Sequence, residues 1–307
     1  MAMTHLIGLD WGTTSLRAYR FDGSGEVAAS RHLPSGIMQI AGEGTAGFER
    51  ALDQACGDWR SADPAGALVA CGMVGSAQGW REAPYAEIPA SVDALGRALT
   101  TVDTAHGVLH IIPGLIARGP LPDVMRGEET QVVGLLERLE APEVWIGLPG
   151  THAKWVRVRD RRIVAFHTFM TGEVFAALRA HTILGRTMRP APAPDLAAFD
   201  RGVAVARSPD GRRGVLSTVF STRTLGLVGA RPGEAQADYL SGLLSGAEIA
   251  ALGALGEPTL PIALAGDAEL CARYGRALAA SGRAATIAEG ATERGLWRIA
   301  VAAGLAG

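Results

Sequence analysis

Residues 6 to 17 read LIGLDWGTTSLR, and this stretch decides the fold. An apolar run ends at Asp10, the segment Gly12 to Thr14 follows, and polar and apolar residues then alternate up to Phe21. This pattern predicts a strand, a tight turn and a second strand. An acid at the end of a buried strand is costly unless it meets a cation or several hydrogen-bond donors.

The turn after Asp10 has two interpretations. A glycine followed by two hydroxyl residues lets backbone N–H groups approach a phosphate closely, and a neighbouring carboxylate can help to hold a metal–nucleotide complex. An ordinary β-hairpin, in which Asp10 and the threonines make turn hydrogen bonds, explains the same residues. On this segment alone, both interpretations stand.

The bulk composition is that of an ordinary globular protein. The chain has 307 residues, of which 48% are hydrophobic and 20% are charged, with a net charge of −2. The length favours two domains. The small negative charge argues against a nucleic-acid-binding protein, which would carry a basic face. No stretch approaches the roughly 20 uninterrupted apolar residues of a membrane span.

The cysteines and the N-terminus point to the cytoplasm. Cys56, Cys71 and Cys271 are few, odd in number and widely spaced, which is typical of buried thiols in a reducing compartment. No cysteine or histidine pair has the spacing of zinc ligands. The first residues, MAMTHLIGLDWG, have neither the basic region nor the apolar segment of a secretion signal. We therefore expect a cytoplasmic protein.

The opening pattern recurs in the second half of the chain. In VWIGLPGTHAKWVRVRD, residues 144 to 160, Gly150 and Thr151 occupy the places that a glycine and a threonine hold in the first copy. Each copy continues into a third strand-like run. A repeat this long indicates two domains of related fold, each opening with three antiparallel strands. Chance similarity between short hairpins is the alternative.

Periodicity predicts α/β domains around these meanders. Apolar runs predict strands at 67–71, 108–112 and 260–264, and amphipathic or apolar patterns predict helices at 45–59, 128–139, 172–184, 235–255, 268–281 and 291–303. The proline-rich residues 189–194 indicate a stiff surface loop. A domain boundary near residues 140 to 143 fits the repeat.

Lys154 is the only lysine among 29 basic residues. Codon bias toward arginine is one explanation for the scarcity of lysine. Lysine, however, is a compact point charge, whereas arginine is broader and forked. Because Lys154 lies just after the second turn, we favour a function that needs that compactness.

Three turns that are suited to binding phosphate follow one another along the chain. They are the turn after Asp10, the turn before Lys154 and the strand-to-helix turn that contains Gly266 and Asp267. The third places free N–H groups at a helix start. Each turn alone is weak evidence for a phosphate-binding site, whereas the three turns in this order are strong evidence for one.

This ordered set resembles the sugar kinase/actin/heat-shock-ATPase superfamily, and within it the 2-dehydro-3-deoxygalactonokinase family. The strings that carry the resemblance are DWGTTSLRAYRF, CGMVGSAQGWREAPY, MRGEETQVVG, LPGTHAKWV and FMTGEVFAAL, with LAGDAELCARY further on. Several superfamily members carry a DxG in the second phosphate loop, whereas this chain has Leu148-Pro149-Gly150.

The resemblance implies an α/β fold of two duplicated ribonuclease H-like domains, the actin-like ATPase fold, with a nucleotide cleft between them. Residues 1–140 would carry the first phosphate loop and the sugar-acid site. Residues 141–307 would carry the second phosphate loop and the adenosine loop. The last helix, about 291–303, is a candidate for packing back on the N-terminal domain.

The resemblance further implies an ATP-dependent kinase that phosphorylates a terminal hydroxyl of 2-dehydro-3-deoxy-D-galactonate, with ATP and Mg²⁺ as cofactors. Asp10 would hold Mg²⁺ through water, and Lys154 would face either the transferring phosphate or the substrate carboxylate. The groups expected to bind phosphate or nucleotide are Gly12, Thr13, Thr14, Gly150, Thr151, His152, Gly266 and Asp267.

The expected catalytic base follows a glycine at a helix start. Glu128 fits that place and Glu129 is the alternative, although the superfamily base is usually aspartate. One of the two glutamates is expected only to favour the helix dipole. Arg126 is a candidate for the substrate carboxylate, because arginine forks match carboxylates. A surface ion pair is the alternative for Arg126.

The loop after the strand at 67–71 mixes polar and aromatic residues, which suits a polyol. The candidates are Ser76, Gln78, Trp80 and Tyr85. A loop whose Trp80 and Tyr85 merely cover the core is the competing interpretation. The partners expected are a small sugar acid and ATP, without nucleic acid or membrane. The sequence leaves the oligomeric state open, a homodimer being one candidate.

Two rival functions remain at this point. One is a kinase for another hexose or hexonate. The other is a non-kinase ATPase or phosphohydrolase of the same fold, in which water replaces the sugar. ATP turnover with and without sugar acids separates these functions.

Overall fold

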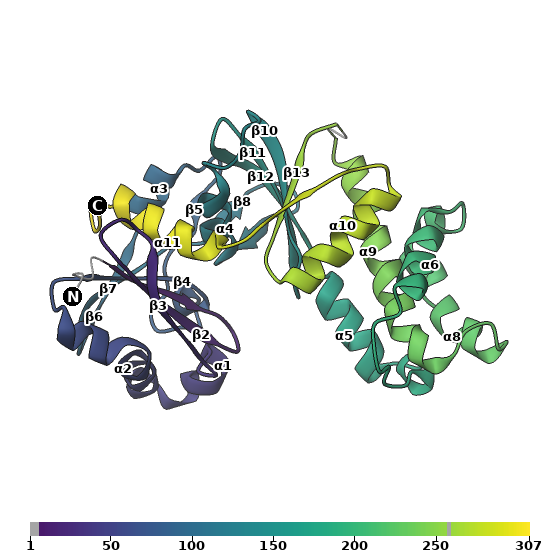
Figure 1. The fold of residues 1–307 in the computed structure, drawn as a ribbon, viewed down its shortest axis with the longest axis horizontal. Helices are drawn as coiled ribbons and strands as arrows, with labels where there is room; N and C mark the ends of the chain where they lie inside the picture. Colours follow the sequence, from purple (N-terminus) through teal and green to yellow (C-terminus); the bar gives the residue numbers. More distant parts are fainter. Residues whose placement is uncertain (1–5, 257–258) are drawn as a thin grey trace. The chain divides into compact units, whose positions relative to one another are not determined.

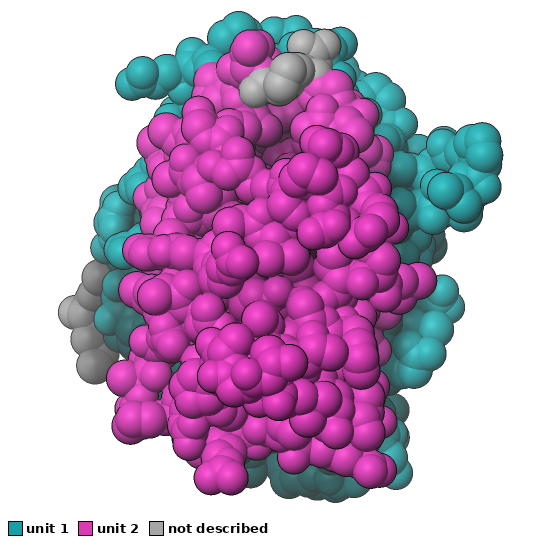
Figure 2. All heavy atoms as spheres, turned by 90° about the vertical axis from the view of Figure 1, so that its right-hand side faces the viewer, with its two compact units in different colours: residues 1–143, 156–166, 288–307 teal, residues 144–155, 167–287 magenta. Residues whose placement is uncertain are grey.

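The computed structural model describes residues 6–256 and 259–307, which form two compact units. Unit 1 comprises residues 1–143, 156–166 and 288–307, and unit 2 comprises residues 144–155 and 167–287 (Figure 2). The predicted division at residue 140 stays a prediction, because it concerns the two copies of the repeat, whereas these units group residues that are neighbours in space.

Unit 1 is built on a six-stranded mixed sheet with the order β3-β2-β1-β4-β7-β6. Its strands are β1 (Leu6–Trp11), β2 (Leu16–Phe21), β3 (Val27–Leu33), β4 (Ala67–Gly72), β6 (Thr100–Thr104) and β7 (Gly107–Ile111). The first three strands form the predicted antiparallel meander, and β4 runs parallel to β1. A small sheet with the order β5-β8-β9 contains β5 (Ala86–Glu87), β8 (Leu115–Ala117) and β9 (Asp123–Met125).

The helices of unit 1 cover both faces of its large sheet (Figure 1). They are α1 (Ile37–Ile40), α2 (Thr45–Ala62), α3 (Val92–Arg97), α4 (Glu128–Leu135) and α11 (Ala291–Ala302). Helix α2 packs its apolar side, including Phe48 and Leu52, on one face. Helix α11 packs against β1, α3 and α4.

Two glycines bring α4 and α11 into backbone contact. A Cβ at Gly134 would lie 1.8 Å from the carbonyl oxygen of Ala291, and a Cβ at Gly295 would lie 1.9 Å from that of Thr130. Side chains at either position would push the helices apart. The close contact explains how a helix from the end of the sequence belongs to the unit that the N-terminus builds.

The second sheet has the order β12-β11-β10-β13-β14, so it too begins with three consecutive strands followed by a crossover. Its strands are β10 (Glu143–Leu148), β11 (Ala153–Arg159), β12 (Arg162–Phe169), β13 (Ile262–Ala265) and β14 (Thr286–Ala288). Strand β13 pairs in parallel with β10, just as β4 pairs with β1. The predicted set of three adjacent, consecutive strands in the second half is therefore confirmed.

The helices of unit 2 are α5 (Thr171–His181), α6 (Leu196–Arg207), α7 (Val215–Thr218), α8 (Ser221–Leu227), α9 (Gln236–Ala254) and α10 (Ala268–Ala280). An apolar core joins the sheet residues Trp145, Trp155 and Leu264 to side chains of α6, α9 and α10. The loop at 189–194 contains no helix or strand, as its prolines predict. Helix α4 ends at Leu135, four residues before the predicted end at 139.

Candidate functional site

The alternation along β1 decides where Asp10 points. Leu9 and Trp11 lie in the core that β1 shares with α2. A Cβ on Gly8 would instead lie 3.0 Å from the Leu296 side chain of α11. Since side chains alternate between the two faces of a strand, Asp10 shares the α11 face with Gly8.

Charged groups from three elements influence Asp10. Its carboxylate lies 3.6 Å from the guanidinium of Arg17 on β2, and its side chain is 21% exposed. Burial raises the pKa of Asp10, Arg17 opposes this shift, and the charges of Glu293 and Glu128 raise the pKa further. A place that gathers carboxylates in partial burial favours an added cation.

The magnesium ion implied by the resemblance fits this place through Asp10. Mg²⁺ usually keeps several waters and binds one or two carboxylates together with the phosphates of its substrate. The partly exposed Asp10 carboxylate meets that need. Over residues 6–256 and 259–307, no group of three or more His, Cys, Asp or Glu side chains is arranged to hold a metal.

The turn after Asp10 is shaped by backbone bonds. The N–H of Gly12 donates to the carbonyl oxygen of Ser15 at 2.9 Å. A Cβ on Gly36 would lie 2.4 Å from the Thr13 carbonyl oxygen, so only glycine lets the following loop pack against this turn. Thr13 and Thr14 are exposed. The turn therefore presents two hydroxyl residues on a supported backbone.

Glycines also bring the start of α4 next to Asp10. Gly127, which precedes the helix, has φ +106°, and a Cβ there would lie 3.3 Å from the Cα of Gly72. A Cβ on Gly72 would in turn lie 3.6 Å from Oδ1 of Asp10. Glu128, the first residue of α4, therefore begins its helix beside the Asp10 carboxylate.

Glu128 and Glu129 have different surroundings. Glu128 is half-buried, and its Oε2 accepts from the N–H of Arg126 at 3.0 Å. Glu129 is 0% exposed and accepts from the N–H of Gly127 at 2.7 Å and from the Thr130 hydroxyl at 3.0 Å. Burial, followed by the charge of Glu128, raises the pKa of Glu129 to about 8. Glu129 is therefore mostly protonated at neutral pH.

The loop predicted to bind a polyol divides between core and surface. Trp80 stacks on Phe48, with ring centroids 5.4 Å apart, and meets Trp11 edge-on at 6.1 Å. These contacts favour the interpretation in which Trp80 covers the core. Gln78 is exposed, whereas Ser76 is buried.

Arg126 is held against the end of that loop. Its Nη2 donates to the carbonyl oxygen of Ala83 at 2.8 Å, and its Cζ lies 4.3 Å from the ring centre of Tyr85. Nε and Nη1 of Arg126 are buried without a hydrogen-bond partner among the described residues, and so is Oγ of Ser76. The surface ion pair considered for Arg126 is therefore not formed within the described part of the chain.

In unit 2, the turn at Gly150 lies against the start of α5. A Cβ on Gly172 would lie 2.5 Å from the Gly150 carbonyl oxygen, and the N–H of Glu173 donates to the Thr151 carbonyl oxygen at 3.0 Å. The side chains of His152 and Glu173 are also hydrogen-bonded. The first turn of α5 thus fixes this turn on two sides.

Lys154 is buried just behind the same turn. Its side chain is 4% exposed, and Nζ donates to the carbonyl oxygen of His152 at 3.0 Å. A buried ammonium group needs such partners. Lys154 therefore places positive charge beneath the backbone of the turn.

The strand-to-helix turn after β13 lies beside the Gly150 turn. Gly266 has φ +126°, and a Cβ there would lie 3.6 Å from the carbonyl oxygen of Pro149. The Asp267 side chain caps α10 by accepting from the N–H of Leu270 at 3.0 Å. Two of the three turns predicted from the sequence are thus neighbours in unit 2.

A pocket of about 320 Å³ opens next to these two turns. Gly150, Thr171 and Asp267 contribute to its lining. Further lining residues are Asp238 and Arg273, whose side chains form a buried ion pair at 2.7 Å. Sequence reasoning missed that pair, because Asp238 and Arg273 are far apart in the chain and only Arg273 lies in a quoted string, LAGDAELCARY.

The wall of this pocket is tied together by Glu248 of α9. Its carboxylate is 3% exposed and accepts from Nε1 of Trp155 at 2.7 Å, from the Tyr274 hydroxyl at 2.7 Å and from the Thr171 hydroxyl. Burial raises the pKa of Glu248, and the three donors oppose that shift. One carboxyl group therefore joins β11, α5 and α10.

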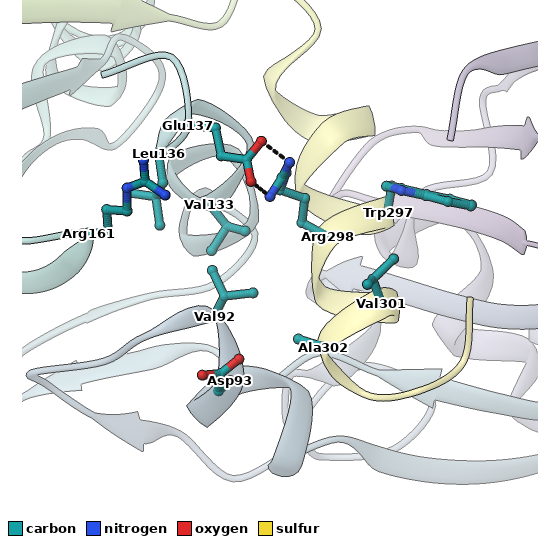
Figure 3. A pocket seen from close by; sticks show the side chains of 10 residues that line it. All are labelled: Val92, Asp93, Val133, Leu136, Glu137, Arg161, Trp297, Arg298, Val301 and Ala302. Atoms are coloured by element: carbon teal, nitrogen blue, oxygen red, sulfur yellow. Dashed lines mark hydrogen bonds and ion pairs between the residues drawn. The ribbon is translucent and has the colours of Figure 1, made fainter. Parts of the chain in front are cut away.

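Unit 1 has a separate pocket of about 350 Å³ between α3, α4 and α11 (Figure 3). Val92, Val133 and Val301 give it an apolar floor, and Glu137 pairs with Arg298 at its side. None of the residues predicted to bind substrate or nucleotide lines this pocket.

Comparison with known proteins covers nearly the whole chain. The model of the 2-keto-3-deoxy-galactonokinase family matches residues 10–299. A 2-dehydro-3-deoxygalactonokinase from Escherichia coli strain K12 is 35% identical over 287 residues, covering 93% of each chain.

Solved structures give the same picture of the fold. The crystal structure of a candidate 2-dehydro-3-deoxygalactonokinase from Sinorhizobium meliloti is 34% identical, covers 97% of this chain and 98% of its own, and has a TM-score of 0.88. The activator of the 2-hydroxyisocaproyl-CoA dehydratase from Clostridium difficile is 14% identical, covers 98% of this chain and 92% of its own, and has a TM-score of 0.51. The second likeness concerns the fold alone. The predicted α/β fold of the actin-like ATPases is confirmed.

The described residues include no helix whose length and apolar character would let it cross a membrane.

Proposed function

The chain belongs to the 2-keto-3-deoxy-galactonokinase family, and from this premise we propose that it transfers the γ-phosphate of ATP to the terminal hydroxyl of 2-dehydro-3-deoxy-D-galactonate. The product is the 6-phosphate, and the step serves galactonate catabolism in the cytoplasm. A relative named for this activity covers 93% of the chain, which supports the substrate class.

One observation within the fold carries the proposal most directly. Asp10 at the end of β1 and Glu128 at the start of α4 share one face of unit 1, connected through Gly72 and Gly127. Phosphoryl transfer needs a carboxylate that helps to hold a metal and a second group that takes the proton of the attacking hydroxyl. The two acids can fill these two roles.

Asp10 would hold Mg²⁺, which would neutralise negative charge that develops on the phosphates. The N–H groups and hydroxyls of Gly12, Thr13 and Thr14 would donate to phosphate oxygens. The exposure of both threonines supports that role. The burial of Asp10 supports its role in holding the metal, because a cation offsets the cost of a partly buried carboxylate.

Glu128 is the proposed base. It takes the proton of the substrate hydroxyl while that oxygen forms a bond to the γ-phosphorus, and the bond from the γ-phosphorus to the bridging oxygen breaks to release ADP. Glu129 is unsuited to this role, because it is fully buried and mostly protonated at neutral pH. We assign Glu129 to holding the Gly127 backbone at the helix start.

The pocket of unit 2 is the proposed site of the nucleotide. The turns at Gly150 to His152 and at Gly266 to Asp267 stand at its edge, where backbone N–H groups can meet phosphates. Its volume of about 320 Å³ is within the range of small-molecule sites. Lys154 would add positive charge behind the Gly150 turn rather than contact the sugar acid.

The test is ATP consumption by the purified chain with a panel of acceptors. The panel contains 2-dehydro-3-deoxy-D-galactonate, other hexonates, neutral hexoses and water alone. We expect turnover that depends on the keto-deoxy acid and on Mg²⁺. Turnover that no sugar acid changes would instead identify an ATPase or phosphohydrolase, and a preference for a neutral hexose would identify another sugar kinase.

The Glu128→Gln variant tests the base within the same assay. We expect kcat to fall by roughly 100-fold to 10,000-fold, the usual contribution of a general base, with the Kd for ATP nearly unchanged. Glu140→Gln, an exposed acid in the segment after α4, is the matched control. A near-normal rate in Glu128→Gln would move the role to another acid.

A further inference from the structure

Two of the three guanidinium nitrogens of Arg126 are buried, and the hydrogen-bonding capacity of the group is largely unused. Five N–H donors belong to an arginine side chain. Among the described residues, Nη2 has the Ala83 carbonyl oxygen as acceptor, whereas Nε and Nη1 are buried without any acceptor. Burying cationic donors without acceptors costs stability, so the arrangement is expensive for the folded protein.

The surroundings hold this charge in place rather than neutralise it. The Tyr85 ring lies 4.3 Å from Cζ of Arg126 and offers its negative face. On another side, a Cβ at Gly75 would lie 2.9 Å from Nη1, so a side chain there would press on the guanidinium. The site thus combines a fixed fork, an aromatic wall and a glycine whose missing side chain makes room for the guanidinium.

A second unsatisfied donor follows that glycine in the chain. Ser76 is 8% exposed, and its hydroxyl also lacks a partner in the described structure. The backbone N–H of Ser76 is used by the Met73 carbonyl oxygen, so the free group is the side chain alone. A second donor without a partner therefore belongs to the residue next to the glycine that packs against Arg126.

We propose that Arg126 and Ser76 form the subsite that receives the carboxylate of the sugar acid. The inference rests on the proposed function and deepens it by naming what distinguishes an acid from a neutral sugar. A carboxylate offers two planar acceptor oxygens, which match the arginine fork, and it carries the charge that the site lacks. An aldose or polyol hydroxyl supplies neither.

The location agrees with the chemistry of the transfer. The N–H of Arg126 donates to Oε2 of Glu128, the proposed base, at 3.0 Å, so the two residues are joined through the backbone that leads into α4. The substrate would place its reacting hydroxyl at Glu128 and its opposite end, the carboxylate, at the Arg126 side chain. Because protein atoms cover Nε and Nη1, the loop from Ser76 to Tyr85 must yield as the carboxylate enters.

The experiment compares the sugar acid with its C1 amide, which keeps the shape and removes the charge. We expect the wild-type chain to prefer the acid. In Arg126→Gln we expect KM for the acid to rise by about 10- to 100-fold, the value of a charged hydrogen-bonding contact, while KM for ATP stays within about twofold. The preference for acid over amide should disappear.

Three further variants complete the test. Arg126→Lys retains the charge without the fork, and we expect it to lie between the wild type and Arg126→Gln in KM for the acid, with its melting temperature reporting folding. Arg118→Gln, which removes an exposed arginine that pairs with Glu87, is the matched control with unchanged kinetics. Ser76→Ala should raise KM for the acid by a smaller factor.

The outcomes separate this inference from the proposed function. If the wild type phosphorylates the acid and Arg126→Gln keeps the full preference for acid over amide, the carboxylate subsite is wrong and the kinase assignment stands. If the wild type phosphorylates no keto-deoxy sugar acid, both fall together. An intact preference in a folded Arg126→Lys with a lost one in Arg126→Gln supports charge as the decisive property.

Discussion

The carboxylate of Asp10 lies 3.6 Å from the guanidinium of Arg17, which is its antiparallel partner across β1 and β2. On its other side, Asp10 is in parallel register with Cys71 of β4. The acid therefore stands at the junction between the antiparallel meander and the parallel part of the sheet. Because the side chain of Arg17 is half-exposed, the Asp10 carboxylate has room for a second cation.

Replacing this acid should separate activity from stability. Because burial raises the pKa of Asp10, its ionised form is a burden on the folded state, and Asp10→Asn should keep or raise the melting temperature at pH 7. The loss of metal-assisted charge stabilisation should lower kcat by about 100-fold or more. Asp103→Asn, an exposed acid on β6, is the control. A fully active Asp10→Asn would remove Asp10 from the metal site.

The buried Glu129 predicts how stability depends on pH. Its pKa is about 8 in the folded chain and near 4.5 in the unfolded chain, so the folded state binds more protons between these values. Its contribution to the free energy of unfolding is therefore complete below pH 4.5 and is lost as the pH rises toward and through 8. Denaturation by urea at several pH values should show this slope in the wild type and a flatter one in Glu129→Gln. Equal slopes would contradict the raised pKa.

The glycines between α4 and α11 predict a large difference between two similar substitutions. Gly134→Ala places a methyl group 1.8 Å from the Ala291 carbonyl oxygen, so the overpacking should cost about 1–3 kcal/mol despite the better helix propensity of alanine. Gly275→Ala on α10 meets nothing within 4 Å and should stabilise by roughly 0.5–1 kcal/mol. Urea midpoints of the two variants check the prediction, which fails if both shift in the same direction.

Lys154 offers a test of compactness against codon bias. Its ammonium group is buried and donates to the His152 carbonyl oxygen, and a guanidinium there would be larger and forked. We expect Lys154→Arg to lower kcat/KM for ATP by about tenfold, equal to about 1.4 kcal/mol of transition-state binding. Arg157→Lys, in the same strand, should change it by less than about twofold. Full activity in Lys154→Arg would favour the codon-bias interpretation.

Local sequence was sufficient for the elements that carry the turns. The predicted strand at 67–71 is β4 (Ala67–Gly72), and the predicted helix at 45–59 is α2 (Thr45–Ala62). Periodicity succeeds here because each element buries one continuous face. Periodicity placed the end of the helix less exactly at 128–139, where the α-helix ends at Leu135. Glycine and tertiary packing, rather than amphipathicity, shape that segment.

The amino-acid sequence by itself determined the two meanders, the order of the three turns and the family, since these depend on residue types at fixed spacings. Only the tertiary structure distinguishes the two neighbouring acids that are candidates for the base. Glu128 and Glu129 are adjacent and chemically identical, yet α4 leaves one half-exposed near Asp10 and buries the other completely. The difference arises because successive helical residues point in different directions, and the packing around the helix then sets burial and pKa.

The same reason applies to pairings that no motif revealed. Asp238 and Arg273 meet at the pocket proposed for the nucleotide, and Glu248 joins three elements, because packing brings together residues that are far apart in the chain. Arg126 was recognisable as a candidate from its type. The fold alone left two of its guanidinium nitrogens buried without acceptors, and those unsatisfied donors are what identify the carboxylate subsite.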